Sequence, residues 1–327
     1  MEAKQIENFR TETYQKNTKE GEVINYTTDL IYEKDGTNPH QAVWFNSVAD
    51  LVNCVIANDF KRLGGSGVWD YNGDNSIFGA EEWERDQSQK WQYGTDYPTK
   101  EATVEALTNG EATSKMMGRA AQVKINLYDK HPELFELERS ASKMKRRRSY
   151  GESGDELNID RYMSGDPAMW QNMTRRPQKN TMRIMLNSGM NAGADSNKFV
   201  ENMILIASFV DIIEMAGVNC EVWLAPVANN ITQETIVGIV GCKVKSADEP
   251  LDLSRFISAG AAGLFRHFTF KTYMNILKGR PSYGLGRSCS TVPAWVKEMF
   301  DFDVVINSDD SEDQALTIFT TALKNLQ

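Results

Sequence analysis

Short apolar segments alternate with longer amphipathic ones in the second half of the chain, from about Thr181 to the end. A short apolar run favours a strand, whereas apolar residues three and four positions apart favour a helix. Gly217 is typical of a helix end, and Asn229-Asn230 of a turn between two strands. The pattern predicts strands at residues 183–187, 219–227, 236–245 and 303–306, and helices at residues 197–216, 252–277, 293–300 and 311–326.

Strands that alternate with helices favour an α/β fold, in which helices cover both faces of a mostly parallel sheet. The turn at Asn229-Asn230 predicts that one strand runs antiparallel to its neighbour. We therefore expect an α/β domain at residues 181–327, with ligands binding at the carboxyl ends of its strands.

The first half of the chain has a different character. Its first 40 residues are polar and predict an arm with the composition of a flexible segment. Apolar residues at helical spacing then predict a mainly helical region over residues 41–138, with helices at 47–63, 99–107 and 112–128. Ser47 can cap the first of these helices. A basic connecting segment, residues 139–180, separates this region from the α/β domain.

Composition excludes several classes of site. The cysteines, at positions 54, 220, 242 and 289, lie far apart and form no C-x-x-C pair, which disfavours zinc and redox motifs and favours free thiols. The three histidines lie near neither a cysteine nor each other, so a histidine-based metal site is not expected. No apolar run is long enough to span a bilayer. We expect a cytoplasmic protein without a membrane partner.

Charge is strongly segregated along the chain. The net charge is −9, yet the segment from Arg139 to Arg183 holds eleven positive and five negative residues, so it carries +6 and the remainder carries −15. The sharpest run is Lys143-Met144-Lys145-Arg146-Arg147-Arg148-Ser149-Tyr150. Such a run favours contact with nucleic-acid phosphates, and aromatic residues nearby favour base stacking. The predicted nucleic-acid-binding residues are Lys143, Lys145, Arg146, Arg147, Arg148, Tyr150, Arg175, Arg176 and Lys179.

Another interpretation of the same run requires no ligand. Short runs of lysine and arginine are common, and many of them are solvated helix ends. The run could also face the acidic surface of its own chain, since the remainder carries −15.

The loop after the first strand of the α/β domain reads Asn187-Ser188-Gly189-Met190-Asn191-Ala192-Gly193. Here residues 181–326 resemble the von Willebrand factor A family, a Rossmann-like fold whose first strand ends in the metal-site motif D-x-S-x-S. The three ligand positions of that motif hold Asn187, Gly189 and Asn191 in this chain. Because a carboxylate and two hydroxyls are missing, the loop is a degenerate metal site, and we expect no metal and no cofactor.

A second likeness is to uncharacterised phage-encoded proteins that pair a helical N-terminal region with a degenerate A-type domain. It depends on the arginine cluster, residues 154–162, Gly165-Asp166-Pro167 with Trp170, and residues 183–193. This resemblance implies a phage origin, hence the host cytoplasm, but no activity.

No catalytic motif is complete. The stretch Gly284-Leu285-Gly286-Arg287-Ser288 lacks the spacings of a phosphate-binding loop, and nothing pairs Ser288 or Cys289 with a base such as His267. We therefore expect a non-enzymatic, phage-type accessory protein that binds nucleic acid, single-stranded DNA above all, in phage transcription or replication. A phage or host protein could be a further partner. The alternative is a protein-interaction scaffold that uses the loops at residues 187–193 and 284–288.

Overall fold

The computed structural model describes the chain in segments, and all structural statements below concern them. They are residues 6–17, 23–33, 39–57, 97, 100–136, 139, 147–152, 156–174, 181–189, 196–215, 217–229, 237–260, 264–269, 272–273, 276, 287–289 and 291–325.

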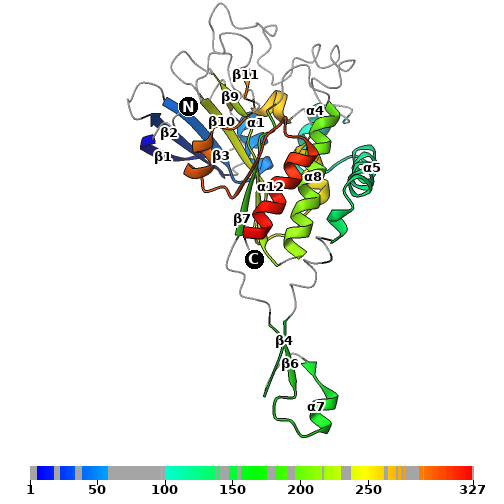
Figure 1. Cartoon of the computed structure of the whole chain (residues 1–327). Coiled ribbons are helices and arrows are strands. Elements are labelled where there is room, and N and C mark those ends of the chain that lie inside the picture. The colour runs from blue at the N-terminus through cyan, green and yellow to red at the C-terminus, as the bar shows by residue number, and fades with distance from the viewer. Residues whose placement is uncertain are drawn as a thin grey trace, which may run out of the picture.

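The described segments form one large sheet that joins the two halves of the chain (Figure 1). Its strand order is β1-β2-β3-β10-β8-β7-β12, and β9 pairs with both β10 and β11. The strands are β1 (Ile6–Asn17), β2 (Val23–Glu33), β3 (Pro39–Phe45), β7 (Thr181–Leu186), β8 (Asn219–Leu224), β9 (Val227–Asn229), β10 (Val237–Lys245), β11 (Arg287–Ser288) and β12 (Val304–Ile306).

Parallel and antiparallel pairs both occur in this sheet. Strand β7 lies between β8 and β12 and is parallel to both, whereas β10 is antiparallel to β8 and parallel to β3. The prediction of an α/β fold whose sheet combines parallel strands with an antiparallel one is therefore confirmed, and the antiparallel strand is β10, which pairs with β8 and β9. The predicted turn at Asn229-Asn230 lies partly outside the described residues, because β9 ends at Asn229.

Helices form where apolar periodicity predicts them, and α1, α8, α9 and α12 pack on the sheet. In α1, the Ser47 hydroxyl accepts the Asp50 N–H at 3.0 Å, so the predicted cap is present. The predicted long helix at residues 252–277 instead ends first at Gly260, and a π-helix, η1, follows. The helices are α1 (Val48–Ala57), α4 (Lys100–Asn109), α5 (Ser114–Lys130), α8 (Ser196–Met215), α9 (Leu253–Ala259), η1 (Leu264–Thr269), α11 (Ala294–Met299) and α12 (Glu312–Asn325).

The core has two layers, one on each face of the sheet. Successive side chains of a strand point to opposite faces. In β7, Ile184 therefore joins the cluster beneath α1, α8 and α12, whereas Met185 joins the cluster beneath α11. Strand β8 divides in the same way between Val222 and Trp223. This period of two is what allows the sheet to bury both faces.

Strands stand in place of the polar arm expected over residues 1–40. β1 and β2 pair along most of their length, and β2 pairs with β3, which is parallel to the central β10. In β2, the sequence Val23-Ile24-Asn25-Tyr26-Thr27 is rich in β-branched and aromatic residues. Polar composition does not prevent strand formation at a sheet edge, because one face of an edge strand can remain in water.

A second, smaller sheet occupies the segment expected to be a basic connector. It has the order β4-β6-β5, with β4 (Arg147–Gly151), β5 (Glu156–Leu157) and β6 (Trp170–Thr174), and the helix α7 (Ile159–Met163) lies between β5 and β6 in the chain. Figure 1 shows it apart from the large sheet. We call residues 147–152 and 156–174 the β4–β6 module.

Candidate nucleic-acid interface

The register of the β4–β6 module brings the two halves of the predicted basic patch to one end. Strands β4 and β6 are antiparallel, with Arg147 opposite Thr174 and Gly151 opposite Trp170. Residues 143–146 precede Arg147 in the chain, and residues 175–179 follow Thr174. Chain connectivity therefore attaches both basic segments to the same end of the strand pair. We call residues 143–148 and 175–179 the stem, and residues 149–174, which include α7, the tip.

The stem and the tip differ in charge. Residues 143–148 hold five positive residues and no carboxylate, and residues 175–179 hold three positive residues and no carboxylate. Residues 149–174, by contrast, hold five carboxylates and one arginine, a net charge of −4. A polyanion is therefore attracted to the stem and repelled by the tip.

The one arginine of the tip, Arg161, is used inside the module. Its guanidinium lies 3.8 Å from the centroid of the Tyr150 ring. It also donates to Asp166 Oδ2 at 3.1 Å and to the carbonyl oxygen of Ala168 at 3.3 Å. Arg161 thus holds α7 against β4, and one face of Tyr150, a predicted stacking residue, is covered.

Arg183, at the end of the predicted basic segment, is also paired internally. Its Nε donates to Glu221 Oε1 at 2.9 Å, and its Nη1 to the carbonyl oxygen of Phe300 at 2.6 Å. Burial would raise the pKa of Glu221, but hydrogen bonds from Trp223 and Arg183 and the charge of Lys243 outweigh it and hold the pKa below its usual value. Arg183 therefore fastens the large sheet and contributes no free charge to the stem.

The structure places only part of the predicted nucleic-acid site. Arg147 and Arg148 lie in β4, with side chains outside the described part, and Tyr150 is half-buried. The other predicted residues lie outside the described segments: Lys143, Lys145, Arg146, Arg175, Arg176 and Lys179.

The loop that resembles a metal site is held in place by the side chain of its first residue, Asn187. Asn187 is fully buried, and its Oδ1 accepts the N–H of Gly189 at 3.0 Å and that of Val227 at 3.1 Å. Its Nδ2 donates to the carbonyl oxygen of Cys289 at 2.6 Å. Because both oxygen lone pairs of Asn187 accept hydrogen bonds, this amide joins three chain segments and has none left for a cation. Asn191 lies outside the described residues.

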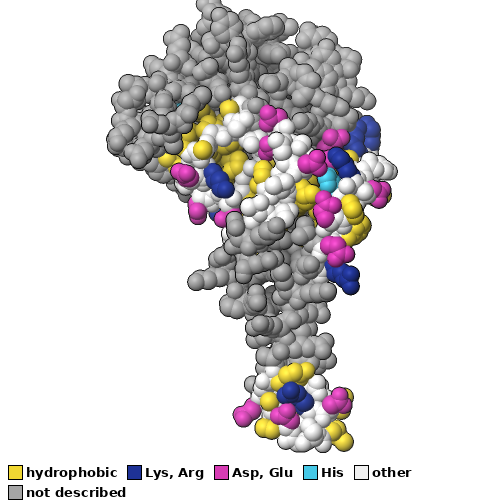
Figure 2. Space-filling model, viewed as in Figure 1, with side chains coloured by type: hydrophobic (Ala, Val, Ile, Leu, Met, Phe, Trp, Pro, Cys, Tyr) yellow, Lys and Arg dark blue, Asp and Glu magenta, His cyan; other side chains and the backbone are white. Residues whose placement is uncertain are grey.

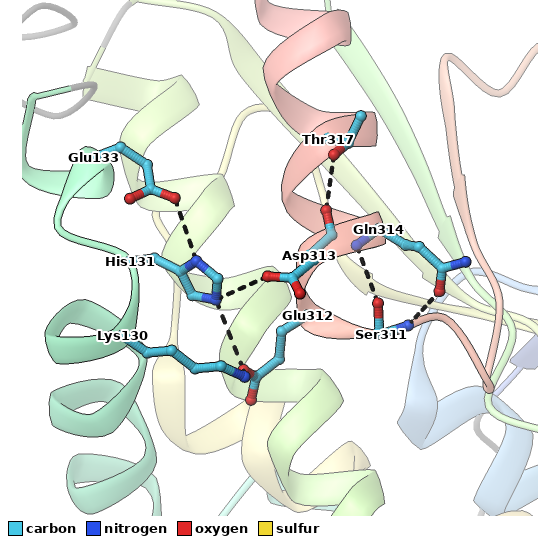
Figure 3. A network of polar contacts seen from close by, with 8 residues as sticks. All are labelled: Lys130, His131, Glu133, Ser311, Glu312, Asp313, Gln314 and Thr317. Atoms are coloured by element: carbon cyan, nitrogen blue, oxygen red, sulfur yellow. Dashed lines mark hydrogen bonds and ion pairs between the residues drawn. The ribbon is translucent and has the colours of Figure 1, made fainter.

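Figure 3 shows a polar network between the C-terminal end of α5 and the N-terminal end of α12. His131 Nδ1 is 3.2 Å from Glu133 Oε1, its Nε2 is 3.6 Å from Asp313 Oδ1, and Lys130 pairs with Glu312. Carboxylates in the first turn of α12 also complement the helix dipole. The network fastens α5 to α12.

A cavity of about 200 Å³ lies beside this network, between α5, α8 and the loop before α12. Its floor includes Val123 and Leu205, and its rim includes Glu201, Asp309 and Asp310. Binding sites for small molecules are usually larger. The acidic rim repels phosphate, so the cavity does not extend the nucleic-acid interface.

Two features of the module were missed from sequence. One is the pairing of Arg161 with Asp166. The only local sequence signal near it is Asn158, a residue type that favours the start of a helix, and in the structure Asn158 Oδ1 accepts the N–H of Arg161 at 3.0 Å. The other is the outward direction of the apolar side chains of α7, for which the sequence offers no signal, since an apolar helix face is normally buried.

A family model described as Domain of unknown function (DUF7192) matches residues 125–327, a range that includes the β4–β6 module and strands β7 to β12. No curated protein and no solved structure matches the chain. Among the helices that the structure describes, none is long and apolar enough to cross a membrane.

Proposed function

Since the chain belongs to this DUF7192 family, whose description assigns no activity, we propose from the geometry that the protein binds nucleic acid through the stem of the β4–β6 module. The main support for the proposal is the register of β4 and β6, in which Arg147 is paired with Thr174. The two basic segments, residues 143–148 and 175–179, are separated in the chain by residues 149–174. Because residue 146 directly precedes Arg147 and residue 175 directly follows Thr174, we infer from this pairing that the two segments form one basic patch.

Electrostatics supports this location over the rest of the described surface. Contacts between cationic side chains and phosphates supply most of the affinity of nonspecific nucleic-acid binding. The stem carries eight positive residues without a carboxylate, whereas the chain as a whole carries −9. Arg161 and Arg183, two other arginines of the predicted basic segment whose side chains the structure describes, are paired internally and are not part of the proposed interface.

The preference for single strands, and for DNA, is part of the proposal. Single strands bind where a basic surface lies beside aromatic side chains. Tyr150 and Trp170 are both half-buried in the strands that lead away from the stem. We further propose a non-enzymatic accessory role in phage transcription or replication, in the host cytoplasm.

We also propose that residues 181–326 are related to von Willebrand factor A domains. The order β10-β8-β7-β12 supports this, because β7, the first strand of the region, lies between β8 and β12, and β10 is antiparallel to β8. The side-chain oxygen of Asn187 already accepts two hydrogen bonds, and in this respect the loop departs from the metal site of that family.

Reversing the charge of the stem tests the proposed function. In a variant with Arg146→Glu, Arg147→Glu and Arg148→Glu, we expect affinity for labelled single-stranded DNA to fall at least tenfold. The slope of log K against log salt should decrease by about 2, because three phosphate contacts are lost. Fluorescence anisotropy with single-stranded and duplex DNA and with RNA, at several salt concentrations, measures both quantities.

A second variant tests the register itself. Arg175→Glu with Arg176→Glu should weaken binding in the same way, because both segments are attached to the same end of the strand pair. The matched control reverses three basic residues elsewhere, Lys115, Arg119 and Lys297, and should leave the salt slope unchanged. Equal losses in the control and stem variants, or no binding by the unmodified protein at low salt, would overturn the proposal.

A further inference from the structure

The short helix α7 turns its apolar side chains toward solvent. Ile159, Tyr162 and Met163 are exposed by 69%, 56% and 78%. Positions three and four apart share one face of a helix, so the three side chains form a single stripe. Arg161 lies on the opposite side, over Tyr150 and against Asp166. The helix therefore turns Arg161 toward the module and its apolar face toward solvent.

Contacts inside the module hold α7 in this orientation. Asn158 caps the helix, and Arg161 makes a ring contact and two hydrogen bonds inside the module. To bury the apolar stripe against the module, α7 would have to turn Arg161 into solvent and lose those contacts. Exposed apolar patches that the fold holds in place are typical of binding surfaces.

Charge argues against a second copy of this chain as the occupant. A two-fold contact between α7 stripes would bring the two acidic tips together, because residues 149–174 carry −4 in each copy, and like charges repel.

Charge argues against nucleic acid as the occupant. Asp160 and Glu152 are exposed at the tip, and residues 149–174 carry −4. Figure 2 shows carboxylates beside apolar side chains at this end of the molecule. A surface of this kind is complementary to an apolar helix face flanked by basic residues.

We propose that the apolar stripe of α7, Ile159, Tyr162 and Met163 with the Asp160 carboxylate at its flank, docks onto a partner protein through an apolar helix face flanked by lysine or arginine. The tip then holds a protein while the stem remains available to nucleic acid. This inference concerns a different surface from the proposed function, and either can fail without the other.

Methyl NMR on the full chain tests the docking surface with two defined peptides. Both are helical and share one stripe of leucines, but one is flanked by lysines and the other by glutamates. The labelled methyl groups are those of Ile159 and Met163. We expect the lysine-flanked peptide to shift both methyl signals and to bind at least tenfold more tightly than the glutamate-flanked peptide.

Three variants make the result specific. Ile159→Ser with Tyr162→Ser should weaken binding of the lysine-flanked peptide at least tenfold, whereas Ile125→Ser, at an exposed isoleucine of α5, should leave it unchanged. Asp160→Lys keeps the stripe and should reverse the preference between the peptides. Single-stranded DNA should leave both methyl signals in place.

Several outcomes would overturn the docking proposal. These are unshifted methyl signals with both peptides, equal affinity for the two, or an equal loss in the Ile125→Ser variant. Sedimentation that shows a dimer lost in the variant with Ile159→Ser and Tyr162→Ser would identify a second copy as the occupant instead. Methyl shifts caused by DNA would assign the surface to nucleic acid.

Discussion

Asn187 shows at the scale of one residue how a motif position can have a different role. The sequence predicts a degenerate metal-site loop there, and the described part of that loop is instead held by three hydrogen bonds from the Asn187 side chain. An amide can donate and accept at once, whereas the carboxylate of the complete motif can only accept when ionised. The asparagine is therefore suited to joining Cys289, Gly189 and Val227.

Replacing Asn187 by alanine should destabilise the fold. The change leaves two buried N–H groups and one carbonyl without their partner, so the free energy of unfolding should fall by about 2–4 kcal/mol. Urea denaturation followed by circular dichroism measures the change. Asn126→Ala, at an exposed position of α5, is the control and should change stability by less than about 0.5 kcal/mol. Equal effects of the two substitutions would contradict the structural role of Asn187.

At the scale of the element, the parallel pair of β3 and β10 depends on a glycine. Gly241 lies opposite Trp44, and a Cβ at Gly241 would stand 2.0 Å from Cε3 of the Trp44 ring. That ring is itself held by Trp223 and Phe300, with centroids 5.5 Å and 4.7 Å away. The ring therefore has little freedom to move, and the close approach of the two strands requires a residue without a side chain.

A pair of glycine-to-alanine substitutions tests this close approach. Gly241→Ala should lower the free energy of unfolding by about 1–3 kcal/mol, because the added methyl group overpacks the Trp44 side of the sheet. Gly118→Ala in α5 meets nothing within 4 Å and should raise stability by up to about 1 kcal/mol, since alanine favours a helix more than glycine does. Thermal unfolding of both variants shows whether each substitution raises or lowers the stability of the fold. A stabilised Gly241→Ala variant would refute the packing of Trp44 against β10.

At the scale of the whole molecule, the four cysteines differ in how deeply they lie in the hydrophobic core. All four are thiols that form no disulfide, as predicted from their spacing. Cys54, Cys220 and Cys242 belong to the main hydrophobic cluster, which extends from the first half of the chain to the last. Burial raises the pKa of Cys242 to about 12 and also raises that of Cys220. Cys289, by contrast, is only half-buried.

Thiol modification by a disulfide reagent at pH 8 should therefore be biphasic. One equivalent, Cys289, should react first, and the Cys289→Ser variant should lack that phase. The other three thiols should react slowly and together, because the thiolate is the reactive form and the cluster must open to release it. Mass spectrometry of the modified peptides identifies each site. Rapid modification of Cys242 in the absence of denaturant would show that the cluster is not a single core.

The sequence by itself determined most of the strands and helices after Thr181, because apolar periodicity is a local property of the chain, although the helix predicted at residues 252–277 is interrupted after Gly260. It also determined the segregation of charge that makes the stem a candidate site. Only the tertiary structure decided that β1 to β3 join the large sheet, that Arg161 and Arg183 are paired internally, and that α7 turns its apolar face outward. Strand pairing, ion pairing and burial depend on neighbours that are distant in sequence, and local patterns do not record them.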